Sequence, residues 1–429
     1  MNHSKTLQQR DLQSVWHPFT QMKIESNAIP IVRGKGVYLY DENGKQYIDG
    51  ISSWWVNTHG HAHPYIAQKV FEQLNTLEHV IFAGFTHEPA VQLAERLLKL
   101  LPENHTKIFY SDNGSTAVEV ALKMAFQYWY NQGIEKYDIV AFKNSYHGDT
   151  FGAMSVSQRS AYTHPFSPNL FDVNFIDAPI SGKENITLQK LQEIIRQKKV
   201  AAFIFEPLVQ GAEGMIMYAP EALDNLIALC KENNILCIAD EVMTGFARTG
   251  RMFACDYLTH KPDIICMSKG ITGGTMALGA TSCTEAIYQA FWSDDKLKTF
   301  FHGHSYTANP VACAAALASL DLFQQDETCN GIAMIRTMHE QFVAKLKTFR
   351  NAGNPRSRGT ILAFEYLTNE DKSYFHSERD SIYEFFLNKN ILLRPLGNTI
   401  YIMPPYCINE SELNKIYSAI EEFLNKTNN

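Results

Sequence analysis

Long apolar runs are missing from this 429-residue chain, and so are clusters of one charge. No stretch is apolar over the roughly 20 residues that a membrane-spanning helix needs, and the opening segment MNHSKTLQQRDLQSVW contains no apolar signal-peptide core. The 38 basic and 45 acidic side chains leave a formal net charge of −7 without a basic tail, which argues against nucleic acid as the main partner. We therefore expect a cytoplasmic protein that acts on small molecules and binds neither membranes nor nucleic acids.

The eight cysteines give no sign of a zinc site or a disulfide framework, because no two of them form a CxxC pair. Most of them lie inside apolar runs such as ILCIAD and DIICMS. A free thiol in such a run behaves as a small buried hydrophobic group. We therefore predict reduced, structural cysteines, as is usual in the cytoplasm.

Through the middle of the chain, short apolar runs alternate with longer amphipathic segments. Apolar residues recur at helical spacing in two of these segments, Ser115–Tyr130 and Glu221–Glu232. Short buried strands separated by helices are typical of a parallel sheet covered on both faces. The sequence therefore predicts an α/β fold in which a mostly parallel sheet lies between helices. The candidate strands are Lys107–Tyr110, Asp138–Phe142, Ala201–Phe205, Leu236–Ala239 and Ile264–Met267.

The two ends of the chain have a different pattern. Residues 29–50 predict a hairpin, with a turn at Asp41–Gly44 between two alternating strands. From about Asp326 the chain becomes helical and charged, and it then returns to short strands at Ile361–Phe364 and Ile400–Met403. We predict a large domain over residues 61–325 and a smaller α+β lobe built from residues 1–60 and 326–429.

Two of the apolar runs end abruptly in a charged residue, Asp240 in one and Lys269 in the other. Such positions lie at the carboxyl edge of an open α/β sheet, where ligands bind, and a lone buried lysine is costly unless its amine is neutral or paired. One chemistry uses both groups. The lysine amine forms a Schiff base with an aldehyde cofactor and moves a proton, while the aspartate keeps the cofactor's pyridine nitrogen protonated. The alternative is a structural Asp–Lys ion pair.

A cofactor phosphate needs a cradle, and the segment Ser111–Thr116 offers one because it leads from a strand into a helix. Free backbone N–H groups and the helix dipole favour a phosphate there, and the small residues Gly114 and Ser115 let the backbone approach closely. The same residues would serve equally well as a plain helix N-cap. Tyr146, at the end of another strand, could stack on a flat cofactor ring, and segment 303–307 is a second plausible phosphate contact.

His59, His61 and His63 alternate in the segment THGHAHP, which raises the question of a metal site. No Asp or Glu accompanies them at the spacing of a zinc site, and the segment has no HExxH pattern. We favour a turn that leads into a helix and predict no metal. Arg394 lies between two strand-like pieces, and its fork-shaped guanidinium suits a substrate carboxylate, although a surface position is the default for an arginine.

With these residues in view, the sequence resembles the class III aminotransferases of pyridoxal 5′-phosphate (PLP) fold type I. The segment ADEVMTGFARTG, with the lysine of SKG 29 positions after its aspartate, is highly specific for that class. The resemblance covers residues 15–320 and 391–406. Within that class, the sequence resembles more specifically the members that convert 8-amino-7-oxononanoate to 7,8-diaminononanoate in biotin biosynthesis, with S-adenosylmethionine as amino donor. The segments that carry it are VWHPFTQMK, GISSWWVNTHGH, FYSDNGSTAVEVALKMAFQYW, YHGDTFGAMSV and RPLGNTIYIMPP.

The resemblance implies PLP as cofactor, a homodimer with shared active sites, and a set of site residues. The catalytic residue it implies is Lys269, and Ser305 would reach the phosphate of the neighbouring subunit. Arg394 would take the carboxylate of the substrate. The implied cofactor residues are Gly114, Ser115, Tyr146, Asp240, Lys269 and Ser305, and the implied substrate residues are Phe19, Trp54, Tyr146, Lys269, Gly303 and Arg394.

Two positions depart from the usual pattern of these relatives. Phe19 stands where many members have tyrosine, so the ring remains but the hydroxyl is lost, and a missing hydrogen bond is worth about 0.5–1.5 kcal/mol. Ser305 replaces the usual threonine of the phosphate loop and can make the same hydrogen bond, although His304 precedes it where a proline is common.

Phe19 and the segment HGHSYT also resemble relatives that use lysine as the amino donor, so the donor stays open between S-adenosylmethionine and lysine. A general ω-amine:pyruvate transaminase or an aminomutase of the same class is the alternative function. A metal-dependent hydrolase that uses the three histidines is a more distant one.

Overall fold

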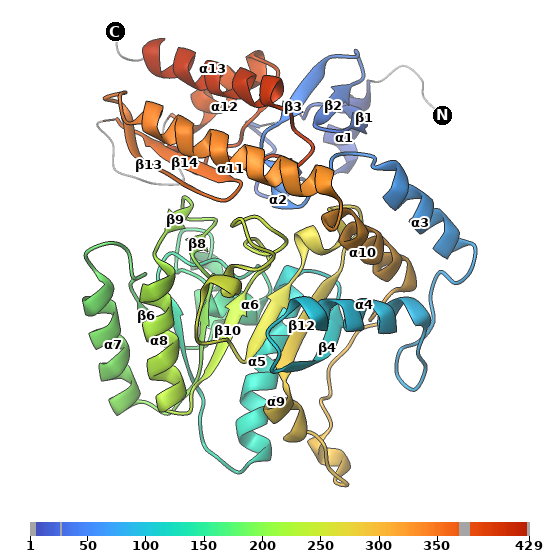
Figure 1. Cartoon of the computed structure of the whole chain (residues 1–429), viewed down its shortest axis with the longest axis vertical. Helices are drawn as coiled ribbons and strands as arrows, with labels where there is room; N and C mark the ends of the chain where they lie inside the picture. Colours follow the sequence, from blue (N-terminus) through green and yellow to red (C-terminus); the bar gives the residue numbers. More distant parts are fainter. Residues whose placement is uncertain (1–5, 26–27, 369–377, 427–429) are drawn as a thin grey trace.

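A seven-stranded sheet forms the centre of the molecule (Figure 1) in the computed structural model, which describes residues 6–25, 28–368 and 378–426. The strand order is β4-β12-β11-β10-β7-β5-β6. Strand β12 runs antiparallel to both of its neighbours, whereas the other neighbouring pairs are parallel. The α/β fold with a mostly parallel sheet is therefore confirmed. The strands are β4 (His105–Ser111), β5 (Asp138–Phe142), β6 (Asn174–Ile176), β7 (Val200–Phe205), β10 (Leu236–Asp240), β11 (Ile264–Met267) and β12 (Gly279–Thr284).

Strand β12 is absent from the strands expected from the sequence. Its residues, GATSCT, include no run of large apolar side chains, although every one of them is buried. Its hydroxyl groups find partners inside the molecule: the Thr281 hydroxyl donates to the Ala117 carbonyl at 2.8 Å, and the Ser282 hydroxyl lies 2.9 Å from Nδ1 of His105. Hydrogen bonding therefore makes a buried strand possible without the apolar pattern on which the prediction depends.

Helices cover both faces of this sheet (Figure 1). On one face, α5 (Gly114–Asn131) packs with Ile204 of β7 in one hydrophobic cluster. On the other face, α7 (Glu184–Gln197) and α8 (Pro220–Glu232) pack with Phe203 and Phe205. Side chains alternate between the two faces of a strand, so the continuous apolar run of β7 reflects burial on both sides.

Strands from the two ends of the chain share a second sheet, of order β1-β2-β3-β15. Strand β15 (Ile391–Leu392) runs parallel to β3 (Gln46–Asp49), so the C-terminal part of the chain pairs directly with the N-terminal part. A third sheet, β13-β14-β16, lies with α11 and α13 beside it (Figure 1). The proposed division into a domain of residues 61–325 and a lobe of residues 1–60 and 326–429 stays a prediction.

The predicted hairpin of residues 29–50 consists of three strands rather than two. The expected turn lies between β2 (Tyr38–Asp41) and β3, but the expected first strand is divided into β1 (Ile31–Lys35) and β2, which pair antiparallel. The chain reverses at Gly36, whose φ of +57° is in the left-handed region that glycine adopts readily. The residues before this glycine, Arg33, Gly34 and Lys35, contain no large apolar side chain, and this small, polar segment lies at the division between the two strands.

The described residues contain no helix that is long and apolar enough to cross a membrane. All eight cysteines are free, and six of them are buried. The remaining helices are α1 (Leu7–Ser14), α2 (Ser52–Trp55), α3 (Pro64–Leu74), α4 (Glu88–Leu100), α6 (Phe151–Val156), α9 (Glu285–Gln289), α10 (Pro310–Phe323), α11 (Asp326–Leu346), α12 (Arg379–Asn388) and α13 (Glu410–Lys426). The remaining strands are β8 (Val209–Gln210), β9 (Ile216–Met217), β13 (Ala352–Arg358), β14 (Ile361–Tyr366) and β16 (Thr399–Ile402).

Candidate active site

Asp240 and Lys269 lie on the wall of one cavity of about 630 Å³. Asp240 is the last residue of β10, and Lys269 begins a short 3-10 helix just after β11. Because β10 and β11 are parallel neighbours, with Asp240 opposite Cys266, the ends of the two strands meet at the same edge of the sheet. Three other residues predicted for the cofactor line the same cavity, namely Gly114, Ser115 and Tyr146.

The pKa of the Lys269 amine is close to neutral pH. Burial lowers its pKa to about 8, although the carboxylates of Asp240 and Glu206 act in the opposite direction. The backbone of Lys269 has a φ of +47°, a left-handed conformation that costs on the order of 1–3 kcal/mol for a residue with a side chain. An amine with this pKa can both accept and return a proton near neutral pH.

The carboxylate of Asp240 is fixed by hydrogen bonds on both oxygens. Nδ1 of His147 lies 2.7 Å from Oδ2, and the Val242 N–H donates to Oδ1 at 3.0 Å. The side chains of Asp240 and His147 are almost fully buried. Nε2 of the same imidazole is buried and has no hydrogen-bond partner among the described residues. The imidazole therefore orients the carboxylate of Asp240.

Glu206 is a further buried carboxylate at this edge of the sheet and is not among the residues predicted from the sequence. It follows the last residue of β7, as Asp240 ends β10, so the same signal was present in the sequence. Its two oxygens accept hydrogen bonds from the N–H groups of Tyr146 and Gly211, at 3.1 and 2.9 Å. Burial raises the pKa of Glu206 to about 7, whereas the nearby His147 lowers it. The site therefore contains a second group that titrates near neutral pH.

The expected phosphate cradle lies at the start of α5. Asn113 caps this helix, since its side chain accepts from the Thr116 N–H at 3.0 Å, so the N-cap interpretation also holds. The Ser115 hydroxyl accepts from the Asp149 N–H at 3.1 Å. Gly148, with a φ of +132°, passes so close that a side-chain carbon there would overlap Ser115. This close approach brings the first turn of α5 and the segment after Tyr146 to the same cavity.

A second cavity of about 640 Å³ adjoins the first, and Tyr146 and Lys269 line both. Several aromatic side chains line it: the ring of Phe19 lies 5.7 Å from that of Trp54 and 6.0 Å from that of Tyr162, in both cases edge to face. Five of the predicted substrate residues therefore lie on one wall. They are Phe19, Trp54, Tyr146, Lys269 and Arg394.

Arg394 adds a guanidinium to the wall of this cavity. Its guanidinium carbon lies 5.5 Å from the centroid of the Trp54 ring. Within residues 6–25, 28–368 and 378–426, no carboxylate forms an ion pair with it. An arginine beside aromatic side chains suits a ligand with an apolar chain and a carboxylate.

Gly303 and Ser305 lie outside both cavities and are exposed. They belong to a turn that Thr307 closes, since its hydroxyl donates to the His304 carbonyl at 2.8 Å. A single chain therefore does not bring Gly303 to the substrate residues or Ser305 to the cofactor residues.

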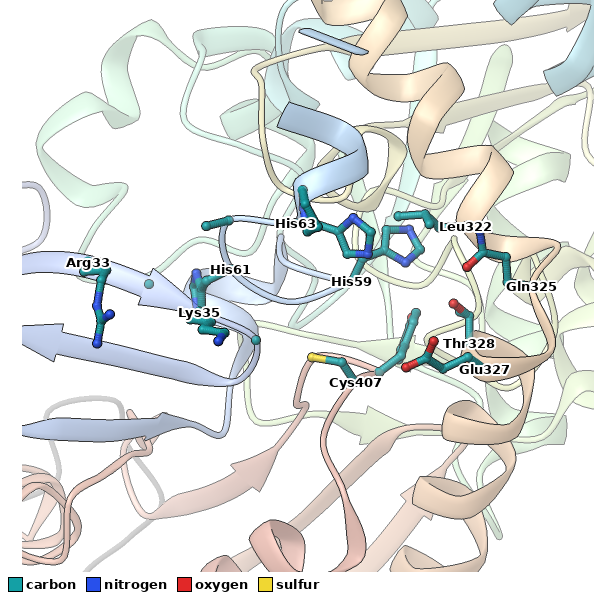
Figure 2. Close-up of a pocket in the computed structure, with 15 residues that line it drawn as sticks. Arg33, Lys35, His59, His61, His63, Leu322, Gln325, Glu327, Thr328 and Cys407 are labelled. Atoms are coloured by element: carbon teal, nitrogen blue, oxygen red, sulfur yellow. The ribbon is translucent and has the colours of Figure 1, made fainter. Parts of the chain in front are cut away.

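His59, His61 and His63 line a separate cavity of about 660 Å³, and their rings do not converge on one point (Figure 2). His59 is hydrogen-bonded to the Ser319 hydroxyl at 3.1 Å, and Nε2 of His61 lies 2.9 Å from Asp49. Throughout the described part of the chain, no group of three or more His, Cys, Asp or Glu residues could hold a metal ion. The structure therefore offers no support for the metal-dependent hydrolase.

Comparison with known proteins assigns the family. The sequence profile of the family described as "Aminotransferase class-III" matches residues 21–424. The chain belongs to the class-III aminotransferases.

Individual relatives of this aminotransferase cover nearly its whole length. It is 46% identical to the adenosylmethionine-8-amino-7-oxononanoate aminotransferase of Synechococcus elongatus, over 96% of this chain and 98% of the relative. The crystal structure of the enzyme of that name from Methanocaldococcus jannaschii is similar with a TM-score of 0.92, at 35% identity over 97% of this chain and 98% of the other. A PLP-bound amine transaminase from an uncultivated Pseudomonas species has a TM-score of 0.90, at 30% identity over 95% and 97%.

Class-III aminotransferases depend on PLP, and the residues around the first cavity fit this cofactor. A carboxylate suited to a pyridinium, an amine suited to an aldehyde and a helix N-terminus suited to a phosphate line one space of about 630 Å³. The phenol side chain of Tyr146 lines the same space, and burial raises its pKa well above the ordinary value, so it stays uncharged.

Proposed function

We propose that this class-III aminotransferase transfers an amino group to 8-amino-7-oxononanoate and so makes 7,8-diaminononanoate, in the cytoplasm, for biotin biosynthesis. The position of Arg394, in a cavity that Lys269 and several aromatic side chains also line, carries the proposal. The substrate has a carboxylate at one end of an apolar chain and its reacting ketone near the other end. The names of the relatives from S. elongatus and M. jannaschii support the same reaction.

In this proposal PLP is held by the residues of the first cavity. Bound PLP supplies an electron sink that stabilises negative charge at the reacting carbon. Asp240 would hold the pyridine nitrogen in its protonated form, and the His147 contact at 2.7 Å orients that carboxylate. Gly114 and Ser115 would bind the phosphate at the first turn of α5, and Tyr146 would contact the ring.

Lys269 is the proposed catalytic residue. Its amine would hold the cofactor covalently and, when free, take a proton from one carbon and return it to another. The pKa of about 8 suits both halves of this task, because a neutral amine is available to accept the proton and an ammonium to return it. Arg394 and the aromatic wall of Phe19 and Trp54 would orient the acceptor over this amine.

The proposed amino donor is S-adenosylmethionine, with lysine as the alternative. Phe19 provides a ring but no hydroxyl in the substrate cavity, so a donor that depends on that hydroxyl would lose about 0.5–1.5 kcal/mol of binding. The likeness to an amine transaminase favours a general ω-amine transaminase as the second candidate function. Such an enzyme would not need a carboxylate site placed for a long acceptor, because the carboxylate of pyruvate adjoins its ketone.

We further propose a homodimer in which Ser305 reaches the cofactor phosphate of the partner subunit. The turn that carries Ser305 lies beside the segment around residue 79, because the rings of His79 and Tyr306 are 5.4 Å apart. Large apolar side chains on these segments are exposed, and such surfaces often mark protein contacts. They include Ile81, Phe85, Phe301 and Tyr306.

The direct test is an assay of the PLP-loaded protein with 8-amino-7-oxononanoate and each donor in turn, with 7,8-diaminononanoate measured by mass spectrometry. We expect product with S-adenosylmethionine or with lysine. Rapid transfer from simple amines to pyruvate, with no 7,8-diaminononanoate from either donor, would support the ω-amine transaminase instead. Light scattering tests the assembly, and a monomer at assay concentration would contradict the shared site.

A further inference from the structure

The indole of Trp55 stands between the two cavities and lies against Lys269. It lines both of them, and Nζ of Lys269 is 4.8 Å from the centroid of its ring. Trp55 itself is only 4% exposed, so the contact is shielded from water. An ammonium group over the face of a tryptophan is attracted by the negative charge of that face, most strongly where water is excluded.

The ring of Trp55 is held in place from two sides. Its Nε1–H donates to the Tyr401 hydroxyl at 2.9 Å, and the two rings meet edge to face with centroids 6.1 Å apart. On another side the ring packs against Gly211, where an added side-chain carbon would lie 3.2 Å from Cζ3 of the indole. The indole therefore cannot turn away from Lys269 without losing a buried hydrogen bond.

The backbone that carries the ring is also fixed. Trp55 has a φ of +68°, a strained conformation that persists only where the surroundings impose it. The buried guanidinium of Arg248 donates to the carbonyl groups of Asn57, at 2.9 Å, and of Trp55, at 3.4 Å. A third contact, at 2.9 Å, joins the same guanidinium to the Pro404 carbonyl. The side chain of Arg248 thus fixes the backbone of the segment that presents the Trp55 ring to Lys269.

We propose that Trp55 is a positioning residue that holds the amine of Lys269 in its ammonium form between proton transfers. The proposal rests on the proposed function, because it assumes that the amine is free during part of the reaction. The neutral amine takes a proton from the substrate carbon and becomes an ammonium, which the indole face stabilises. The ammonium then gives the same proton to the second carbon and returns to the neutral amine, and Trp55 itself neither gains nor loses a proton.

The test measures the protonation of Lys269 in the cofactor-free, full-length protein and needs no activity. Competitive acetylation over a range of pH, read by peptide mass spectrometry, gives the midpoint at which the Lys269 amine becomes reactive. The exposed amines of Lys190 and Lys199 serve as internal references. We expect Trp55→Leu to move this midpoint lower by about one pH unit, the shift that corresponds to loss of a desolvated cation–π contact.

Trp54→Leu is the matched control, since it removes an indole from the same cavity that lies near Arg394 rather than Lys269. This variant is expected to leave the Lys269 midpoint in place. Trp55→Phe keeps a ring with a weaker quadrupole and is expected to lie between the native protein and Trp55→Leu. This graded order distinguishes an electrostatic role from a structural one and remains measurable if the leucine variant does not fold.

An unchanged midpoint in folded Trp55→Leu and Trp55→Phe would overturn the proposal. A midpoint that rises would also overturn it, because the indole would then act by excluding water from the amine. Neither result would contradict the proposed function, which is tested separately by product formation and by the attachment of PLP to Lys269.

Discussion

Replacement of Arg394 by methionine is expected to weaken the enzyme selectively toward its acceptor. The change keeps most of the apolar stem and removes the guanidinium from the wall of the substrate cavity. A hydrogen bond to a charged group contributes about 1.5–3 kcal/mol. Loss of that contact corresponds to a fall of roughly 10- to 150-fold in kcat/KM for 8-amino-7-oxononanoate. Arg394→Lys should recover only part of it, because an ammonium cannot make the two parallel hydrogen bonds of a guanidinium.

The assay separates the two halves of the reaction. Single-turnover absorbance measurements with the donor alone report the first half, and 7,8-diaminononanoate formation reports the second. We expect Arg394→Met to slow the second half of the reaction more than the first. With an acceptor analogue that lacks the carboxylate, the substitution should have little effect on the second half. Equal acceptor kcat/KM in Arg394→Met and the native protein would refute the assignment of Arg394 to the carboxylate and favour the general ω-amine transaminase.

Three further predictions concern the cofactor residues and the core. Uptake of PLP by the cofactor-free protein should accelerate as the pH rises through about 8, because burial lowers the pKa of Lys269 to that value and only the neutral amine attacks an aldehyde; a rate that falls over this range in stopped-flow absorbance would contradict this. Asp240→Asn should bind PLP yet lose at least about 100-fold in kcat, since a carboxamide cannot hold the pyridine nitrogen protonated; near-native turnover would exclude the proposed role. Phe203→Ala, at a fully buried position between sheet and helices, should lower the free energy of unfolding by about 3–5 kcal/mol in denaturant titrations. A loss below about 1 kcal/mol would contradict this, because it would mean that neighbouring side chains move in to fill the cavity.

The strands that carry the site could be predicted because each combines an apolar run with an abrupt polar end. Asp240 and Lys269 follow such runs, and the parallel pairing of β10 with β11 brings their ends together. Glu206 directly follows β7 and is a third polar residue after such a run, so the same signal in the sequence could have indicated it. In contrast, β12 could not be predicted from an apolar pattern, because its buried hydroxyl groups depend on partners such as the Ala117 carbonyl.

The contacts that orient the catalytic groups depend on residues far apart in the sequence. Trp55 and Tyr401 are hydrogen-bonded across 346 positions, and His147 meets Asp240 across 93. No local spacing encodes either pair, and of these four residues only Asp240 was predicted from the sequence. Ser305 is a different case, because its proposed ligand lies in another subunit and neither the sequence pattern nor a single chain contains that contact.

The most direct measurement identifies the amine that carries the cofactor. The PLP-loaded protein is reduced with borohydride, digested and mapped by peptide mass spectrometry, with the Lys269→Ala variant treated in parallel. We expect a phosphopyridoxyl group on Lys269 and no stable label in the variant. A label on another lysine of the native protein, or an equally labelled Lys269→Ala variant, would contradict the assignment of Lys269 as the residue that binds the cofactor.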